Sequence, residues 1–153
     1  MWGRARGPLV PFSQGSERGM IERRFPREFR SIESIVGFVN EFLAPCGIEP
    51  DQAYDVHLII EELFTNMVKY SRESTESIEI ALGWTAPELT IRLRDFGVNR
   101  FDVTQPPPVD VNAPLQKRHR GGLGLHFVRE TANRIEYDWT DRVSTITVTQ
   151  RLA

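Results

Sequence analysis

Apolar residues recur along this chain at two different spacings, and the spacing separates helices from strands. Residues 20–28 alternate apolar and charged side chains, which predicts a short strand. Pro26 restricts that strand to a sheet edge, because proline cannot donate a ladder hydrogen bond. Residues 31–44 and 51–71 instead place apolar side chains three and four positions apart, which predicts two amphipathic helices.

The second half of the chain is richer in strand patterns. Residues 77–85 and 88–97 predict two strands, and residues 134–140 and 143–152 predict a closing hairpin. Residues 123–133 predict a third helix. This order favours an α/β (α+β) two-layer sandwich, in which a mixed, largely antiparallel sheet is covered by helices on one face.

One internal segment, residues 98–120, has no periodicity and is rich in proline. Connections of this length are unusual in a compact domain and are most often lids or disordered segments, and the position just before a glycine turn favours a lid. Residues 1–19 also lack periodicity, so we expect a flexible N-terminal tail, with Met20 as a candidate for the natural start. Residues 20–153 are expected to form one domain.

Composition and charge argue against several classes of function. The chain has 153 residues and a formal net charge of −2, so bulk electrostatics give no reason to expect nucleic-acid binding. No stretch approaches the roughly 18 apolar residues of a membrane-spanning helix. Cys46 is the single cysteine, which excludes an internal disulfide and indicates a reducing compartment such as the cytoplasm.

Three short segments carry the candidate chemistry, and the first lies on the second predicted helix. Glu62 and Asn66 are four residues apart, so their side chains share one helix face, whereas Glu61 points elsewhere. Glu62 can accept a proton or orient a hydroxyl. Asn66 offers the hard oxygen that Mg²⁺ prefers. Acid–amide pairs at this spacing are also common on solvated helix faces, so the pair alone does not define a site.

The second segment ends a predicted strand. Asp95 can accept a hydrogen bond from an exocyclic amine such as that of adenine, and Gly97 allows a ligand to approach the backbone. The structural alternative is a turn aspartate followed by a glycine that supplies a positive φ angle.

The third segment is a glycine turn that opens the third predicted helix. Free amides at a helix start bind phosphate, and an arginine just before the turn can grip a terminal phosphate with its guanidinium. The candidate nucleotide-binding residues here are Arg120, Gly121, Gly122, Leu123, Gly124 and Leu125. Together, the three segments suit a magnesium nucleotide.

From about residue 20 to its end, the chain resembles the anti-sigma-factor serine/threonine kinases, a branch of the ATPase superfamily that includes histidine kinases, gyrase B, Hsp90 and MutL. The resemblance rests on E-x-x-x-N in EELFTN, D-x-G in DFGVN and G-x-G in GGLGL. It implies a Bergerat-type ATP-binding fold, with Glu62 as base, Asn66 as Mg²⁺ ligand and Asp95 as adenine contact. The chain departs from the superfamily at Asn99, where a second glycine is usual, and at Tyr70, where a histidine is frequent.

The resemblance also implies an activity. Such a protein uses ATP and Mg²⁺ to phosphorylate a STAS-domain antagonist, and it binds and blocks a sigma factor. The chain could also form a homodimer. Neither nucleic acid nor a membrane is an expected partner. One alternative is a nucleotide-gated protein-binding module without transfer activity, which the departures at Tyr70 and Asn99 leave open. The other is a structural α/β domain, against which the ordered motifs argue.

Overall fold

The computed structural model describes residues 17–100 and 128–152, and a single antiparallel sheet organises them. The five strands lie in the order β1-β2-β3-β5-β4, and each of the pairings between them is antiparallel. The sheet predicted from the sequence is therefore confirmed, without a parallel pair among the described strands. The strands are β1 (Glu17–Phe25), β2 (Ile78–Thr85), β3 (Glu88–Phe96), β4 (Arg134–Thr140) and β5 (Val143–Arg151).

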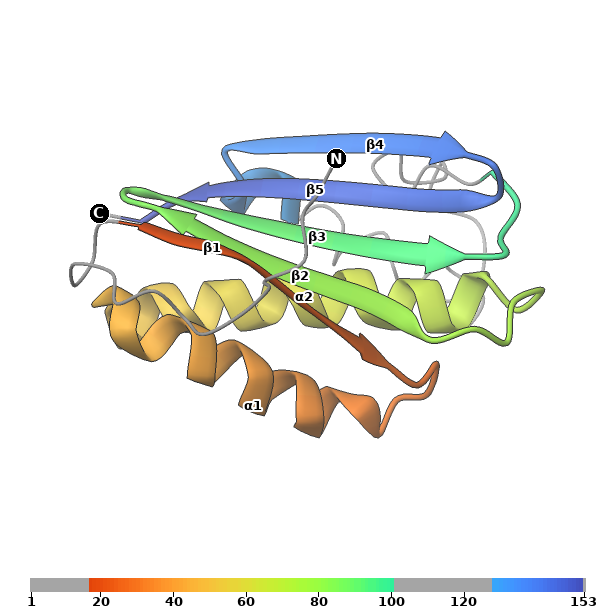
Figure 1. Cartoon of the computed structure of the whole chain (residues 1–153), viewed down its shortest axis with the longest axis horizontal. Coiled ribbons are helices and arrows are strands. Elements are labelled where there is room, and N and C mark those ends of the chain that lie inside the picture. The colour runs from red at the N-terminus through yellow and green to blue at the C-terminus, as the bar shows by residue number, and fades with distance from the viewer. Residues whose placement is uncertain (1–16, 101–127, 153) are drawn as a thin grey trace, which may run out of the picture.

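Two α-helices, α1 (Ser31–Leu43) and α2 (Pro50–Tyr70), lie on one face of the sheet (Figure 1). A short 3-10 helix, η1 (Ala44–Cys46), follows α1, and Gly47 with φ of 69° ends it. This arrangement confirms the two-layer α/β sandwich. The helix α2 precedes β2 and β3 in the chain and runs beneath them. Its C-terminal end lies at the end of the sheet where β3 stops (Figure 1).

Most element boundaries agree with the sequence pattern. The strand β1 is an edge strand, as Pro26 predicted, but it starts at Glu17 and so includes the last residues of the expected tail. The β4–β5 hairpin turns at Asp141 and Arg142, whose φ angles of 52° and 62° are those of a tight two-residue turn. Of the third predicted helix, residues 128–133 are described, and residues 128–131 of these are helical. Most of the expected lid lies outside the described residues.

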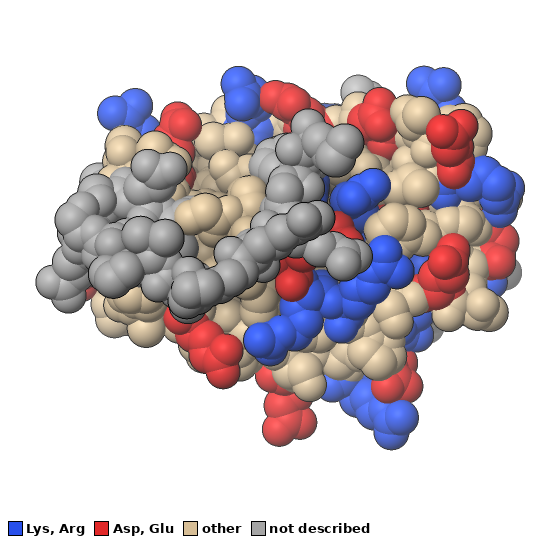
Figure 2. Space-filling model, in the orientation of Figure 1, with Lys and Arg blue, Asp and Glu red and all other residues tan. Residues whose placement is uncertain are grey.

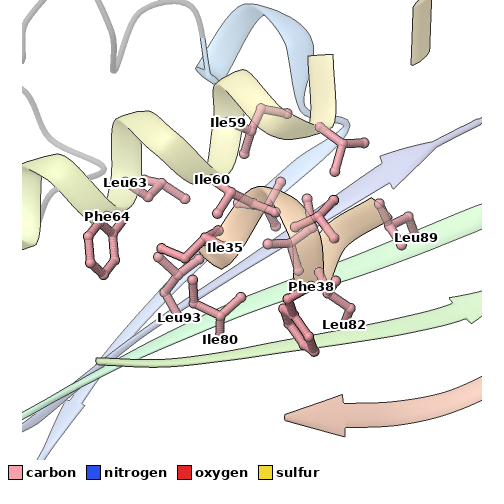
Figure 3. Close-up of a cluster of buried hydrophobic side chains, with 14 of the residues drawn as sticks. Ile35, Phe38, Ile59, Ile60, Leu63, Phe64, Ile80, Leu82, Leu89 and Leu93 are labelled. Atoms are coloured by element: carbon pink, nitrogen blue, oxygen red, sulfur yellow. The ribbon is translucent and has the colours of Figure 1, made fainter. Parts of the chain in front are cut away.

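The core fills the space between the helices and the sheet (Figure 3). Successive side chains of a strand point to opposite faces, so Leu89, Ile91 and Leu93 of β3 all point toward the helices and are fully buried. The stripe on α2 that meets them includes Ile60 and Leu63. No helix in the described part of the chain has the length and apolar character needed to cross a bilayer.

The opposite face of the sheet carries a network of charged side chains centred on Arg92, which is 1% exposed. Its guanidinium lies 3.5 Å from a carboxylate oxygen of Glu22 and 3.7 Å from one of Glu79. Glu79 also lies 3.6 Å from Arg94 and 3.7 Å from Arg24. Burial, more than any other cause, lowers the pKa of Arg92 to about 10. Basic and acidic side chains are interspersed over the view in Figure 2, which agrees with the small net charge.

Candidate functional site

The helix α2 places Glu62 and Asn66 one turn apart, on the flank of its apolar stripe. Glu62 is half-buried, and burial is the largest cause that raises the pKa of its carboxyl above the ordinary value. Lys69 opposes that rise and Glu61 adds to it. Glu61 itself is exposed, as its position on the helix predicted. A carboxylate with a raised pKa is a stronger base than a solvated one, which suits proton abstraction.

Asn66 is buried more deeply than a polar helix residue normally is. Its side chain is 1% exposed, yet neither its amide oxygen nor its amide nitrogen has a hydrogen-bond partner in the described structure. A buried polar group left in this way costs about 1–3 kcal/mol. Native proteins keep few such groups, and those they keep call for an explanation such as a bound ion. The unpaired amide oxygen therefore fits a metal ligand.

Asp95 lies near the C-terminal end of β3, on the helix-facing side, and is 1% exposed. It is paired across the strands with Ser144 of β5, which is also buried. Burial is the main cause that raises the pKa of the Asp95 carboxyl. Hydrogen bonds and charge from Arg27 and a hydrogen bond from Ser71 act in the opposite direction.

Arg27, in the turn between β1 and α1, connects Asp95 to the end of α2. One end of its guanidinium donates to a carboxylate oxygen of Asp95. Another nitrogen donates to the carbonyls of Met67 at 3.2 Å and Ser71 at 3.4 Å, and Nε donates to the carbonyl of Glu76 at 3.1 Å. Met67 follows Asn66 directly, so this one side chain joins the two segments that carry the first two motifs.

Gly97 follows β3 in a conformation that favours glycine, with φ of 71°. A Cβ atom there would lie 2.8 Å from a carboxylate oxygen of Glu76 and 3.5 Å from the hydroxyl of Ser74. Ser74 in turn donates to the carbonyl of Phe96 at 2.5 Å. The backbone beside Asp95 is therefore held close to the segment that follows α2.

Asn99, the departure from the superfamily pattern, anchors this segment. Its backbone nitrogen donates to Glu73 at 2.8 Å, and this hydrogen bond is the largest cause that lowers the pKa of Glu73. Its side-chain oxygen accepts from Arg142 at 3.1 Å, and Arg142 also donates to the carbonyl of Gly97 at 3.0 Å. The chain after β3 is thus fixed to the β4–β5 turn. The other departure, Tyr70, is 38% exposed at the end of α2.

The structure therefore brings together the α2 and β3 motifs through Arg27. The third motif, from Arg120 through Gly121, Gly122, Leu123 and Gly124 to Leu125, lies outside the described residues. The sequence did not point to Arg27 or Ser144 as residues of the site. Arg27 lies in a turn without a motif, and Ser144 joins the site only through the non-local pairing of β5 with β3.

In chemical terms, the described site offers a buried acceptor at Asp95, an unpaired amide oxygen at Asn66 and a base of raised pKa at Glu62. Together with an antiparallel sheet covered by helices on one face, these features define the class of ATP-binding domains found in histidine kinases. Residues 25–150 match the family of histidine kinase-like ATPase domains, and the chain belongs to this family. Membership implies ATP binding.

Some of the individual proteins that this chain is similar to belong to the branch that the motifs resemble. The serine-protein kinase RsbW of Bacillus cereus (strain ATCC 10987 / NRS 248) is 30% identical over 95 residues, and that of Bacillus mycoides (strain KBAB4) is 29% identical over 94 residues. Each match covers 59% of this chain and 59% of the relative.

Two solved structures share the fold. A crystal structure of the RsbU and RsbW domains of a Mycobacterium tuberculosis protein has a TM-score of 0.64 at 15% identity, over 88% of this chain and 33% of that one. The SiaB–SiaC complex of Pseudomonas aeruginosa has a TM-score of 0.56 at 16% identity, over 85% of this chain and 87% of that one. At these identities the two structures support the architecture alone.

Proposed function

We propose that this chain is an ATP-dependent serine/threonine kinase and anti-sigma factor, whose substrate is a STAS-domain antagonist of that factor. The relatives named serine-protein kinase RsbW support the reaction type. The partner and the sigma factor follow from the resemblance of the motifs. The proposed location is the cytoplasm, and the proposal includes either a monomer or a homodimer.

The observation that carries the proposal is the state of Asn66. Its amide is buried and unpaired, one helical turn from a half-buried Glu62 of raised pKa. Mg²⁺ takes hard oxygen ligands, and in nucleotide sites it takes most of them from phosphates and waters. The chain would therefore need to contribute few oxygens, and the amide of Asn66 would be one. When bound, Mg²⁺ would neutralise charge on the transferring phosphoryl group.

Each residue then has a distinct task in the proposed reaction. Asp95 accepts a hydrogen bond from the adenine amine and so orients the nucleotide. Glu62 accepts the proton of the partner's serine hydroxyl as that oxygen bonds to the γ-phosphorus. The bond from the γ-phosphorus to the bridging oxygen breaks, and ADP leaves with the electron pair. In the loose transition states of phosphoryl transfer, positioning of the hydroxyl can matter more than removal of its proton. Arg120 and the glycine-turn amides are proposed to hold the phosphates.

The proposal is tested by incubating the purified protein with Mg²⁺, ATP labelled at the γ-phosphate, and candidate STAS-domain proteins. We expect label on a serine or threonine of one candidate, and none when Mg²⁺ is chelated. Nucleotide-dependent binding of a candidate without any transfer of label would instead support the alternative, a nucleotide-gated binding module. Candidates are best taken from genes beside the one encoding this chain.

A further inference from the structure

Arg27 is a residue of the site that no motif and no comparison assigns. We propose that Arg27 sets base specificity: it holds Asp95 as a charged, acceptor-only group, so that the site takes a purine with an amine at position 6 and rejects one with a carbonyl there. This inference rests on the proposed role of Asp95 in binding adenine. Arg27 would act through Asp95 and is therefore a positioning residue.

The geometry leaves Arg27 little freedom. Its side chain is 8% exposed. Its other nitrogens are already bonded to the carbonyls of Met67, Ser71 and Glu76, at 3.2, 3.4 and 3.1 Å. Because the guanidinium is planar and rigid, these bonds direct the remaining nitrogen at Asp95. An arginine is also always charged, so the positive charge beside Asp95 does not vary with pH.

Two opposing influences act on the charge of Asp95. Burial favours the neutral acid and raises the pKa of its carboxyl. Arg27, from the β1–α1 turn, opposes burial through a hydrogen bond and through its charge, and the Ser71 hydroxyl adds a smaller contribution. Glu73, after α2, acts with burial. Ser144, across the strand pair on β5, carries no charge. Arg27 is thus the cation whose hydrogen bond and charge favour the ionised form of this buried group.

The charge state decides which base fits. A carboxylate only accepts hydrogen bonds, and it has about four lone-pair positions, so bonds from Arg27 and Ser71 leave room for an amine. A protonated carboxyl carries an O–H donor, which can bond the carbonyl of hypoxanthine. Against the ionised form, a carbonyl oxygen meets an acceptor and stays unpaired. That mismatch corresponds to about a 5- to 150-fold loss of affinity.

The test compares the binding of Mg-ATP and Mg-ITP by calorimetry over a range of pH, in the wild-type chain and in Arg27→Gln. Glutamine keeps a polar side chain and removes the charge. Arg30→Gln is the matched control, because Arg30 lies in the same turn but is exposed and pairs with Glu28. Arg27→Lys is a second variant, which keeps the charge and loses the planar fork.

At high pH we expect all four proteins to prefer ATP, by about 5- to 150-fold in the wild type. As the pH falls, Arg27→Gln should lose this preference at a pH where the wild type, Arg30→Gln and Arg27→Lys still show it. A purely structural ion pair would lower the affinity for both nucleotides equally and leave their ratio unchanged.

Three results would overturn the inference. The first is an ATP-to-ITP ratio in Arg27→Gln that follows the wild type at every pH. The second is tighter binding of both nucleotides by Arg27→Gln at an unchanged ATP-to-ITP ratio. That result would show that the Arg27 side chain fills the nucleotide site and hinders binding. The third, which applies even if Arg27→Gln does not fold, is loss of the preference in Arg27→Lys. A wild-type protein without any preference for ATP at high pH would instead refute the proposed role of Asp95 itself.

Discussion

Replacing Asn66 by leucine should raise the stability of the protein and weaken its Mg²⁺-dependent nucleotide binding. Leucine has the branching and the number of side-chain heavy atoms of asparagine but no polar atoms. The amide of Asn66 is 1% exposed and unpaired in the described structure, so its removal relieves a penalty of about 1–3 kcal/mol. For a chain of this length, each kcal/mol raises Tm by about 2–4 °C. We therefore expect Asn66→Leu without nucleotide to melt several degrees above the wild type.

The same substitution removes the proposed metal ligand. Nucleotide affinity measured with Mg²⁺ should fall in Asn66→Leu, whereas affinity measured in a chelator should change little. Asn66→Asp is the matched variant, because it keeps an oxygen of the kind that Mg²⁺ prefers but buries a charge. It should retain Mg²⁺-dependent binding and melt below the wild type.

Thermal melting with and without nucleotide, together with titration calorimetry, measures both effects. A lower Tm for Asn66→Leu than for the wild type would show that the amide has a structural partner. An unchanged Mg²⁺ dependence would show that Asn66 does not bind the metal. Either result would refute the reasoning that links its burial to its role.

Three further predictions follow from the site. Asp95→Asn should weaken binding of ADP and ATP by about 5- to 150-fold in calorimetry, because a buried acceptor becomes a possible donor, and equal affinity would remove Asp95 from the site. Gly97→Ala should lower the free energy of unfolding in urea by about 1–2 kcal/mol, because φ is 71° there, and an unchanged value would show that the turn relaxes at no cost. Phosphoryl transfer should rise with pH through the raised pKa of Glu62, since the basic carboxylate exists above it, so an acidic limb in the range of a solvated glutamate would contradict Glu62 as base.

Local pattern was sufficient to predict most of the fold. The apolar stripe that runs along α2 predicted its length and also placed Glu62 and Asn66 on one face, with Glu61 pointing away. The strands were predicted from alternation, and the tight turn at Asp141 and Arg142 from the gap between two of them. These features depend on residues close together in the sequence, where helix and strand periods act directly.

Non-local pairing explains what the sequence did not predict. The insertion of β5 between β3 and β4 brings Ser144 opposite Asp95, and no local pattern encodes that order. Arg27 reaches Asp95 from a turn far away in the chain. The alternating pattern of β3 would likewise place Arg92 on the outer face of the sheet as an exposed side chain. In the structure Arg92 is almost completely buried and forms ion pairs with Glu22 and Glu79.

The most direct test of the proposed activity compares two neighbouring glutamates in the transfer reaction. Glu62→Gln keeps the size and hydrogen bonding of the side chain but removes the basic carboxylate, and Glu61→Gln makes the same change at an exposed position of α2. With a cognate STAS-domain substrate and γ-labelled ATP, we predict that both variants bind Mg-ATP like the wild type. Transfer should fall by about 10²–10⁴-fold in Glu62→Gln and stay unchanged in Glu61→Gln. Equal transfer rates in the two variants would contradict the assignment of Glu62 as the catalytic base and, with it, the proposed mechanism.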